Sequence, residues 1–157
     1  MSVRKLALRA TRARWVSGCV SFALRHFSRC LPIKRVYEDK LVVALHHPAP
    51  SYYPHILVIP KSRTKTPFAL SDSLFRACVR VGEEVARRYE MPLQLRINGG
   101  SRQEVMQAHF HLYPASLVTG MRRADSFAGA LALARGAAGF SLVLLIGENG
   151  IWIDGRE

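Results

Sequence analysis

The sequence predicts an α+β domain built on an antiparallel sheet, and its composition and its order of elements both support this class. The 157 residues suffice for one domain of ordinary size. Hydrophobic residues make up 49% of the chain and charged residues 22%, which excludes wholesale disorder. The apolar runs are far shorter than the roughly 20 residues of a membrane-spanning helix, so a polytopic membrane protein is also excluded. The predicted order is two strands, one long helix, two strands, and a carboxy-terminal extension of a helix and a β-hairpin.

The first two strands and the long helix follow from apolar patterns in the first part of this region. Residues 40–45 are a β-branched and leucine-rich run, and 56–59 are a second one closed by a proline, so both indicate strands. The prolines in 46–53 predict a loop between them. Apolar residues then recur at helical spacing over 71–91, from an N-cap at Ser71 or Asp72 to a Met-Pro pair, which predicts a helix of about five turns.

Two further strands are predicted on either side of a loop that contains a Gly-Gly pair. Leucine and isoleucine alternate with polar residues in 93–98, which is the pattern of a half-buried strand. Residues 105–113 alternate as well, so a strand there would place Gln107, His109 and His111 on one face. Three polar side chains would then converge at one position of the sheet.

Residues 116–157 are predicted to extend the same domain. A helix is expected over 124–135 and a strand over 141–146. The Asn-Gly pair in 147–150 is a strong hairpin signal, and it leads into a last strand at 151–154.

The charge of the chain is concentrated at its amino terminus. The 23 Lys and Arg exceed the 11 Asp and Glu to give a formal net charge of +12, which favours anionic partners. Residues 1–30 are basic and contain no acid, which predicts a basic extension before a core of residues 31–115. This composition fits a transit peptide, a signal sequence, a helix on anionic membrane lipid, a nucleic-acid contact, or a solvated helix packed on the domain. The expected compartment is cytoplasmic or organellar, and the sequence does not decide between them.

The segment 98–111 carries the chemistry, because a glycine-containing polar loop leads into alternating histidines. Taken alone, His109 and His111 allow three interpretations. They could bind a metal, although further suitable ligands are not nearby in sequence and the three cysteines form no Cys-x-x-Cys pair. They could be structural histidines with satisfied hydrogen bonds. One could be a nucleophile that attacks phosphorus, while the other and nearby amides hold phosphate oxygens.

Three ordered blocks of the sequence resemble the histidine triad (HIT) superfamily. The blocks are 32–39, 54–61, and 103–111 together with Asn98, and the predicted long helix falls in the expected gap. The resemblance implies an α+β fold that is commonly paired into a homodimer and that acts without a metal cofactor on the α-phosphate of nucleotide conjugates. It therefore implies a nucleotide hydrolase or nucleotidyltransferase that forms a nucleotidyl-histidine intermediate.

The resemblance also implies roles for individual side chains. His109 stands in the middle triad position and would be the nucleophile, while His111 stands in the third position and would hold the phosphoryl group. Gln103 would contact the phosphate and the leaving group, and Asn98 would contact the substrate. His55 would support the surroundings of the nucleophile.

Two departures from the family pattern bear on activity. The first triad position is Gln107, whose amide can hydrogen-bond but cannot take a proton. His47 stands where members that hydrolyse nucleotides carry an acid for the ribose hydroxyls, next to His46 in the loop that approaches the ribose and base. These departures leave an alternative to an enzyme, namely a catalytically weak or inactive module that binds nucleotides or polyanions.

Overall fold

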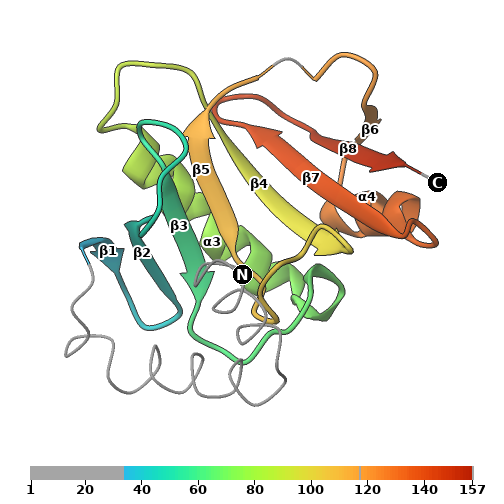
Figure 1. The fold of residues 1–157 in the computed structure, drawn as a ribbon, viewed down its shortest axis with the longest axis horizontal. Helices are drawn as coiled ribbons and strands as arrows, with labels where there is room; N and C mark the ends of the chain where they lie inside the picture. Colours follow the sequence, from blue (N-terminus) through green and yellow to red (C-terminus); the bar gives the residue numbers. More distant parts are fainter. Residues whose placement is uncertain (1–33, 117, 157) are drawn as a thin grey trace, which may run out of the picture.

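The strands of the domain form one antiparallel sheet with α-helices packed against it (Figure 1). The structure, a computed structural model, describes residues 34–116 and 118–156, so the basic extension 1–30 lies outside the described residues. Within that described part, the sheet has eight strands in the order β1-β2-β3-β5-β4-β7-β8-β6. The predicted α+β class and its antiparallel sheet are confirmed. None of the described helices is long and apolar enough to cross a membrane.

The elements follow the predicted order, with a short strand added at each edge of the sheet. The strands are β1 (Arg35–Glu38), β2 (Val42–His46), β3 (Ile56–Pro60), β4 (Leu93–Gly100), β5 (Phe110–Pro114), β6 (Arg122–Ala124), β7 (Gly139–Leu145) and β8 (Ile151–Arg156). The helices are the 3₁₀ turn η2 (Pro67–Ala69), α3 (Asp72–Ala86) and α4 (Phe127–Ala134). The edge strands β1 and β6 were not predicted, because four and three residues are too few to show a periodic pattern.

The long helix α3 packs on the sheet through one apolar face. Its N-cap is Ser71, whose Oγ accepts a hydrogen bond from a backbone N–H three residues on, at 3.2 Å. The helix ends at Ala86, about one turn earlier than predicted. Two backbone N–H groups in the following residues bond carbonyls three residues back, so the chain tightens into turns ahead of Pro92. The buried side chains of α3 include Phe75, Cys78, Val81 and Val85.

The strand register gives the sheet one apolar face and one face with polar residues. In the pairing of β4 with β5, Leu95 lies opposite Leu112, and Arg96 lies opposite His111. Leu95 and Leu112 belong to the core under α3. Because side chains alternate along a strand, Arg96 and His111 point to the other face, and so does Asn98. This second face positions the candidate site.

The carboxy-terminal hairpin extends the sheet. β7 pairs with β4 as far as Gly100, which lies opposite Gly139. The Gly-Gly pair that was predicted as a loop is therefore the end of β4. The ring of Phe140 lies against Gly99, and a Cβ at Gly99 would overlap that ring. The glycine pair thus becomes part of a strand only because a distant segment pairs with it.

The carboxy-terminal helix is shorter than predicted. Residues 122–124 pair with β8 as strand β6, so α4 begins only at Phe127. Ser126 is its N-cap, since its Oγ accepts a hydrogen bond from the backbone N–H of Gly129 at 3.1 Å. The helix packs against β8 and covers the added part of the sheet.

Candidate active site

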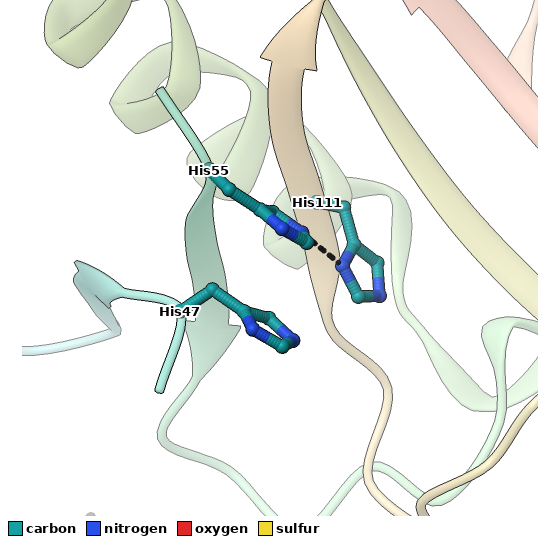
Figure 2. Close-up of side chains that lie close together, drawn as sticks. All are labelled: His47, His55 and His111. Atoms are coloured by element: carbon teal, nitrogen blue, oxygen red, sulfur yellow. Dashed lines mark hydrogen bonds between the residues drawn. The ribbon is translucent and has the colours of Figure 1, made fainter. Parts of the chain in front are cut away.

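Three histidines from separate parts of the chain meet beside β3 and β5. His47 follows β2, His55 precedes β3, and His111 lies in β5 (Figure 2). The rings of His47 and His55 stack with their centroids 4.1 Å apart and their planes 10° apart. The Nε2 of His55 lies 3.0 Å from the Nδ1 of His111, which is hydrogen-bond distance. One nitrogen from each ring can be chosen so that all three lie within 4.8 Å of one another.

Backbone N–H groups determine which nitrogen of these rings carries the proton. The N–H of Ser51 lies 3.3 Å from the Nδ1 of His55, and the N–H of Ala49 lies 3.1 Å from the Nδ1 of His47. Because a backbone N–H can only donate, each Nδ1 accepts, and each neutral ring carries its proton on Nε2. The Nε2–H of His55 then donates to the Nδ1 of His111, so the neutral His111 ring also carries its proton on Nε2.

The imidazoles of the site are neutral at pH 7. Burial lowers the pKa of His55 to about 4 and that of His111 to about 3, and repulsion by neighbouring histidines adds to both shifts. Burial also lowers the pKa values of His47 and His109. The site therefore presents polar but uncharged rings, and the neutral tautomers decide what each nitrogen can do.

The spacing of the three nitrogens allows a metal ion, but the hydrogen bonds favour an anion. An imidazole that ligates a metal offers a lone pair from one nitrogen and usually donates an N–H from the other. In His47 and His55 the Nδ1 faces a backbone N–H donor, so the proton stays on Nε2 and blocks ligation there. The Nε2 atoms of His47 and His111 are N–H donors instead. Donors of this kind suit the oxygens of a phosphate group.

His109 lies beside this cluster, and a backbone carbonyl two residues earlier in the chain orients its ring. Its Nδ1 lies 2.7 Å from the carbonyl oxygen of Gln107. A carbonyl can only accept, so Nδ1 carries the proton and the lone pair of the neutral ring is on Nε2. The ring centroids of His109 and His111 are 4.8 Å apart. Adjacent imidazoles therefore offer a lone pair and an N–H donor.

Gln107 is buried and anchors the loop that leads to β5. Its Nε2 donates to the carbonyl oxygen of Pro60 at 3.1 Å and to that of Ser62 at 3.0 Å. The strand predicted over 105–113 was wrong in its first half, because these residues bond to the neighbouring loop and the strand begins only with β5. The two histidines of this segment adjoin as predicted, whereas the amide nitrogen of Gln107 is turned toward backbone carbonyls.

Gln103 anchors the same loop at its other end. Its Nε2 donates to the carbonyl oxygens of Lys65 and Val105, at 2.5 and 2.7 Å. Between the two glutamines, the backbone N–H of Ala108 donates to the carbonyl oxygen of Thr64 at 2.6 Å. The amide hydrogens of both glutamines are thus engaged by backbone carbonyls in this structure.

Asn98 lies on the same face of the sheet as Arg96 and His111. The β4–β5 register ends with Ile97 opposite Phe110, so Asn98 and His109 are the next residues of the two segments. The Oδ1 of Asn98 accepts a hydrogen bond from the hydroxyl of Ser141 at 2.7 Å. The side chain that was predicted to contact the substrate therefore lies on the face that carries His111, and a residue of the carboxy-terminal extension holds its amide.

The register places His46 away from the site and brings Arg96 into it. His46 pairs with Ile56, whose side chain lies in the core under α3, so His46 is exposed on the face opposite His111. Arg96 lies directly opposite His111. Its Nε is the one buried side-chain nitrogen or oxygen, among the described residues, that has no hydrogen-bond partner. Sequence reasoning missed Arg96 as a site residue, although it alternates with Asn98 on the same strand.

This fold and histidine site belong to a known family of domains. The family model of the HIT domain matches residues 29–116, which is more than half of the chain. The chain therefore belongs to the HIT domain family, and strands β6 to β8 lie beyond the matched region.

Similar proteins come from several bacteria. An uncharacterized HIT-like protein of Borreliella burgdorferi is 31% identical over 93 residues, which are 54% of this chain and 67% of that protein. The crystal structure of a HIT family hydrolase from Legionella pneumophila is 28% identical with a TM-score of 0.52, and the match covers 59% of this chain and 90% of that one. A HIT family protein from Bacillus anthracis is 25% identical with a TM-score of 0.51, over 60% of this chain and 71% of that one.

Proposed function

We propose that this protein is a nucleotide hydrolase or nucleotidyltransferase that acts at the α-phosphate of nucleotide conjugates through a nucleotidyl-histidine intermediate on His109. Membership in the HIT domain family supports the class of activity, and one similar crystal structure is that of a HIT family hydrolase. The observation that carries the proposal is the 2.7 Å contact between Nδ1 of His109 and the carbonyl oxygen of Gln107. It leaves the lone pair on Nε2, where a nucleophile needs it.

The reaction would proceed in two displacement steps. In the first, the Nε2 lone pair of His109 forms a bond to the α-phosphorus, and the leaving group departs with its electron pair and takes up a proton. The ring is then an imidazolium, and the carbonyl of Gln107 stabilises the proton that remains on Nδ1. In the second step water attacks phosphorus, the P–N bond breaks, the electron pair returns to Nε2, and the water releases a proton. A phosphate-bearing acceptor in place of water would give transfer instead of hydrolysis.

The neighbouring donors would stabilise the negative charge that develops on the phosphoryl oxygens. His111 would offer its Nε2–H, and Asn98 would offer its amide hydrogens. Burial lowers the pKa of His111 to about 3, so the ring is neutral at pH 7 and would donate through the single hydrogen on its Nε2. Arg96 would supply positive charge from the strand opposite His111.

We place Gln107 at the first position of the triad, where it would support the loop. A single amide nitrogen carries two hydrogens and can hold two carbonyls, whereas an imidazole nitrogen carries only one. The hydrogen bonds of Gln107 to Pro60 and Ser62 support this role. Because this position is not the nucleophile, the exchange is compatible with activity.

His47 would select the substrate beside the reacting phosphate. An acid at this position would accept hydrogen bonds from ribose hydroxyls, whereas His47 offers a hydrogen on Nε2, which a hydroxyl oxygen can accept and a phosphate oxygen accepts more strongly. We therefore propose a substrate that carries an acceptor there, such as a ribose phosphate. The homodimer implied by the family resemblance belongs to the same proposal.

The decisive experiment is intact-protein mass spectrometry after rapid acid-free quenching with adenosine and guanosine phosphoramidates and dinucleoside polyphosphates. The wild-type chain should show turnover and a mass increase equal to one nucleotidyl group. The His109→Ala variant should show neither while keeping the circular dichroism spectrum of the wild type. Turnover that persists in this variant would overturn the mechanism.

A binding module without catalysis is the second candidate. It is favoured by one observation, namely that the amide hydrogens of Gln103 and Gln107 bond to backbone carbonyls. Such a module should bind nucleotides without forming an adduct, and it should bind nucleic acid or anionic vesicles in a strongly salt-dependent way through the basic residues of 1–30. Replacing those residues by glutamine in the full chain should abolish polyanion binding by the module but leave the turnover of an enzyme intact.

A further inference from the structure

A row of polar residues connects the last strand to Asn98. Asn98 on β4 pairs with Ser141 on β7, and Ser141 pairs with Asp154 on β8, so the three lie side by side across the sheet. Arg102, in the loop after β4, spans this row. Its guanidinium donates to both carboxylate oxygens of Asp154, at 2.7 and 3.3 Å, and to the hydroxyl oxygen of Ser141 at 3.3 Å. The Ser141 hydroxyl in turn bonds to Asn98 at 2.7 Å.

The hydrogen bonds of this row run in one direction, from Arg102 to Ser141 and from Ser141 to Asn98. A guanidinium donates and never accepts, so the hydroxyl oxygen of Ser141 accepts from Arg102. The hydrogen of that hydroxyl is donated to the Oδ1 of Asn98 at 2.7 Å. The amide oxygen of Asn98 therefore faces Ser141, and the amide nitrogen, with its two hydrogens, faces the other way.

Asn98 has two orientations of nearly equal shape, and they have opposite effects on a phosphate. One presents two N–H donors to the site beside His109, and the other presents a carbonyl oxygen that repels phosphate oxygens. Ser141 is 1% exposed. The ion pair of Arg102 with Asp154 holds the guanidinium that donates to the Ser141 hydroxyl, which limits the movement of that hydroxyl. The row therefore holds Asn98 in the orientation that offers donors.

We propose that Ser141 is a positioning residue for the reaction, and that Arg102 and Asp154 hold it so that the Asn98 amide donates to the phosphoryl group on His109. This inference rests on the proposed function. It makes the carboxy-terminal strands part of the active site, although they lie beyond the HIT domain match at residues 29–116. Ser141 acts through Asn98 and does not itself touch the substrate.

A double-mutant cycle in the full chain tests this role. Asn98→Ala should lower kcat/KM for adenosine phosphoramidate about 100-fold, and Ser141→Ala should lower it about tenfold. The double variant should be no worse than Asn98→Ala, because Ser141 has no effect once the amide is gone. A merely structural serine would instead give additive losses, and additive losses in variants with wild-type circular dichroism would overturn the proposal.

Ser116→Ala is the matched control. Ser116 exchanges hydrogen bonds with the side chain of Gln94 at 3.1 and 3.3 Å, on the same face of β4 but four residues before Asn98. Like Ser141→Ala, this variant removes a serine hydroxyl that bonds to a side-chain amide of β4, but the amide of Gln94 lies outside the site. Its kcat/KM should therefore equal that of the wild type. A loss in Ser116→Ala as large as that in Ser141→Ala would also overturn the proposal.

AMP affinity, measured by calorimetry on the same variants, separates this inference from the proposed function. If the wild type binds AMP but turns nothing over, the proposed activity fails, and a non-additive cycle in AMP affinity still supports the role of Ser141. If Ser141→Ala changes neither turnover nor AMP affinity, the role of Ser141 fails while the activity stands. A wild type that neither binds AMP nor turns over a nucleotide overturns both.

Discussion

The carbonyl oxygen of Gln107 lies 2.7 Å from the Nδ1 of His109, and this contact decides the chemistry of the ring. It comes from the backbone, so it survives any substitution at position 107 that keeps the loop in place. Gln107 therefore orients the ring of His109 through its peptide group, while its side chain holds the loop to residues 60–62.

The first prediction concerns the tautomers of the site. His109 should carry its proton on Nδ1, whereas His55 should carry it on Nε2, because the first faces a carbonyl and the second faces the N–H of Ser51. Nitrogen-15 chemical shifts of the imidazoles at neutral pH distinguish the two forms. A proton on Nε2 of His109 would remove the basis for its role as nucleophile.

The second prediction concerns the anchoring role of Gln107. Gln107→Glu should lower the free energy of unfolding by about 1 to 3 kcal/mol, because a carboxylate cannot donate to the two carbonyls that the amide holds. Gln107→His should cost less, since the ring can still donate one hydrogen. Denaturant unfolding of the three proteins measures the order, and equal stability of the Glu variant and the wild type would contradict it.

The third prediction concerns substrate choice at His47. His47→Asp replaces a donor by an acceptor, so preference should move from nucleotide conjugates with a ribose phosphate toward those with free ribose hydroxyls. The ratio of kcat/KM for the two substrates should change about tenfold or more. Steady-state kinetics with an adenosine conjugate and its 2′-phosphorylated counterpart provides the test. An unchanged ratio would show that His47 does not contact the ribose.

The fourth prediction is a loss of stability in mild acid. The unfolded chain has histidines with pKa values of about 6.5, whereas burial lowers the pKa of His55 to about 4 and that of His111 to about 3 in the fold. Below about pH 6.5 the unfolded state binds more protons, so the free energy of unfolding falls as the pH drops toward the folded values. The Tm from circular dichroism should decrease from about pH 7 to about pH 4.5. His55→Gln should make this decrease shallower, and equal slopes would contradict the assignment.

The fifth prediction concerns the join between the HIT core and the extension. Gly99→Ala should lower the free energy of unfolding by about 1 to 3 kcal/mol, because the new methyl group would overlap the ring of Phe140. Gly120→Ala is a comparison without a clash. Its new methyl group would meet no atom within 4 Å, so any loss of stability there comes from the positive φ of 81° at that position. Phe140→Leu combined with Gly99→Ala should recover part of the loss. If Gly99→Ala is as stable as the wild type, β7 does not pack on β4 as described.

The class of the fold, the order of its main elements and the family follow from the amino-acid sequence alone, because apolar periodicity and short motifs are local properties. The sequence also identified His109, His111 and His55, whose rings the structure brings together, and Asn98 on the strand that pairs with β5. It could not determine that His46 lies on the far face and His47 beside the site, since strand register decides the face of each side chain. Likewise, the link from Asp154 to Asn98 and the tautomers of the rings depend on atoms from distant segments. Only the tertiary structure brings those hydrogen-bond donors and acceptors together.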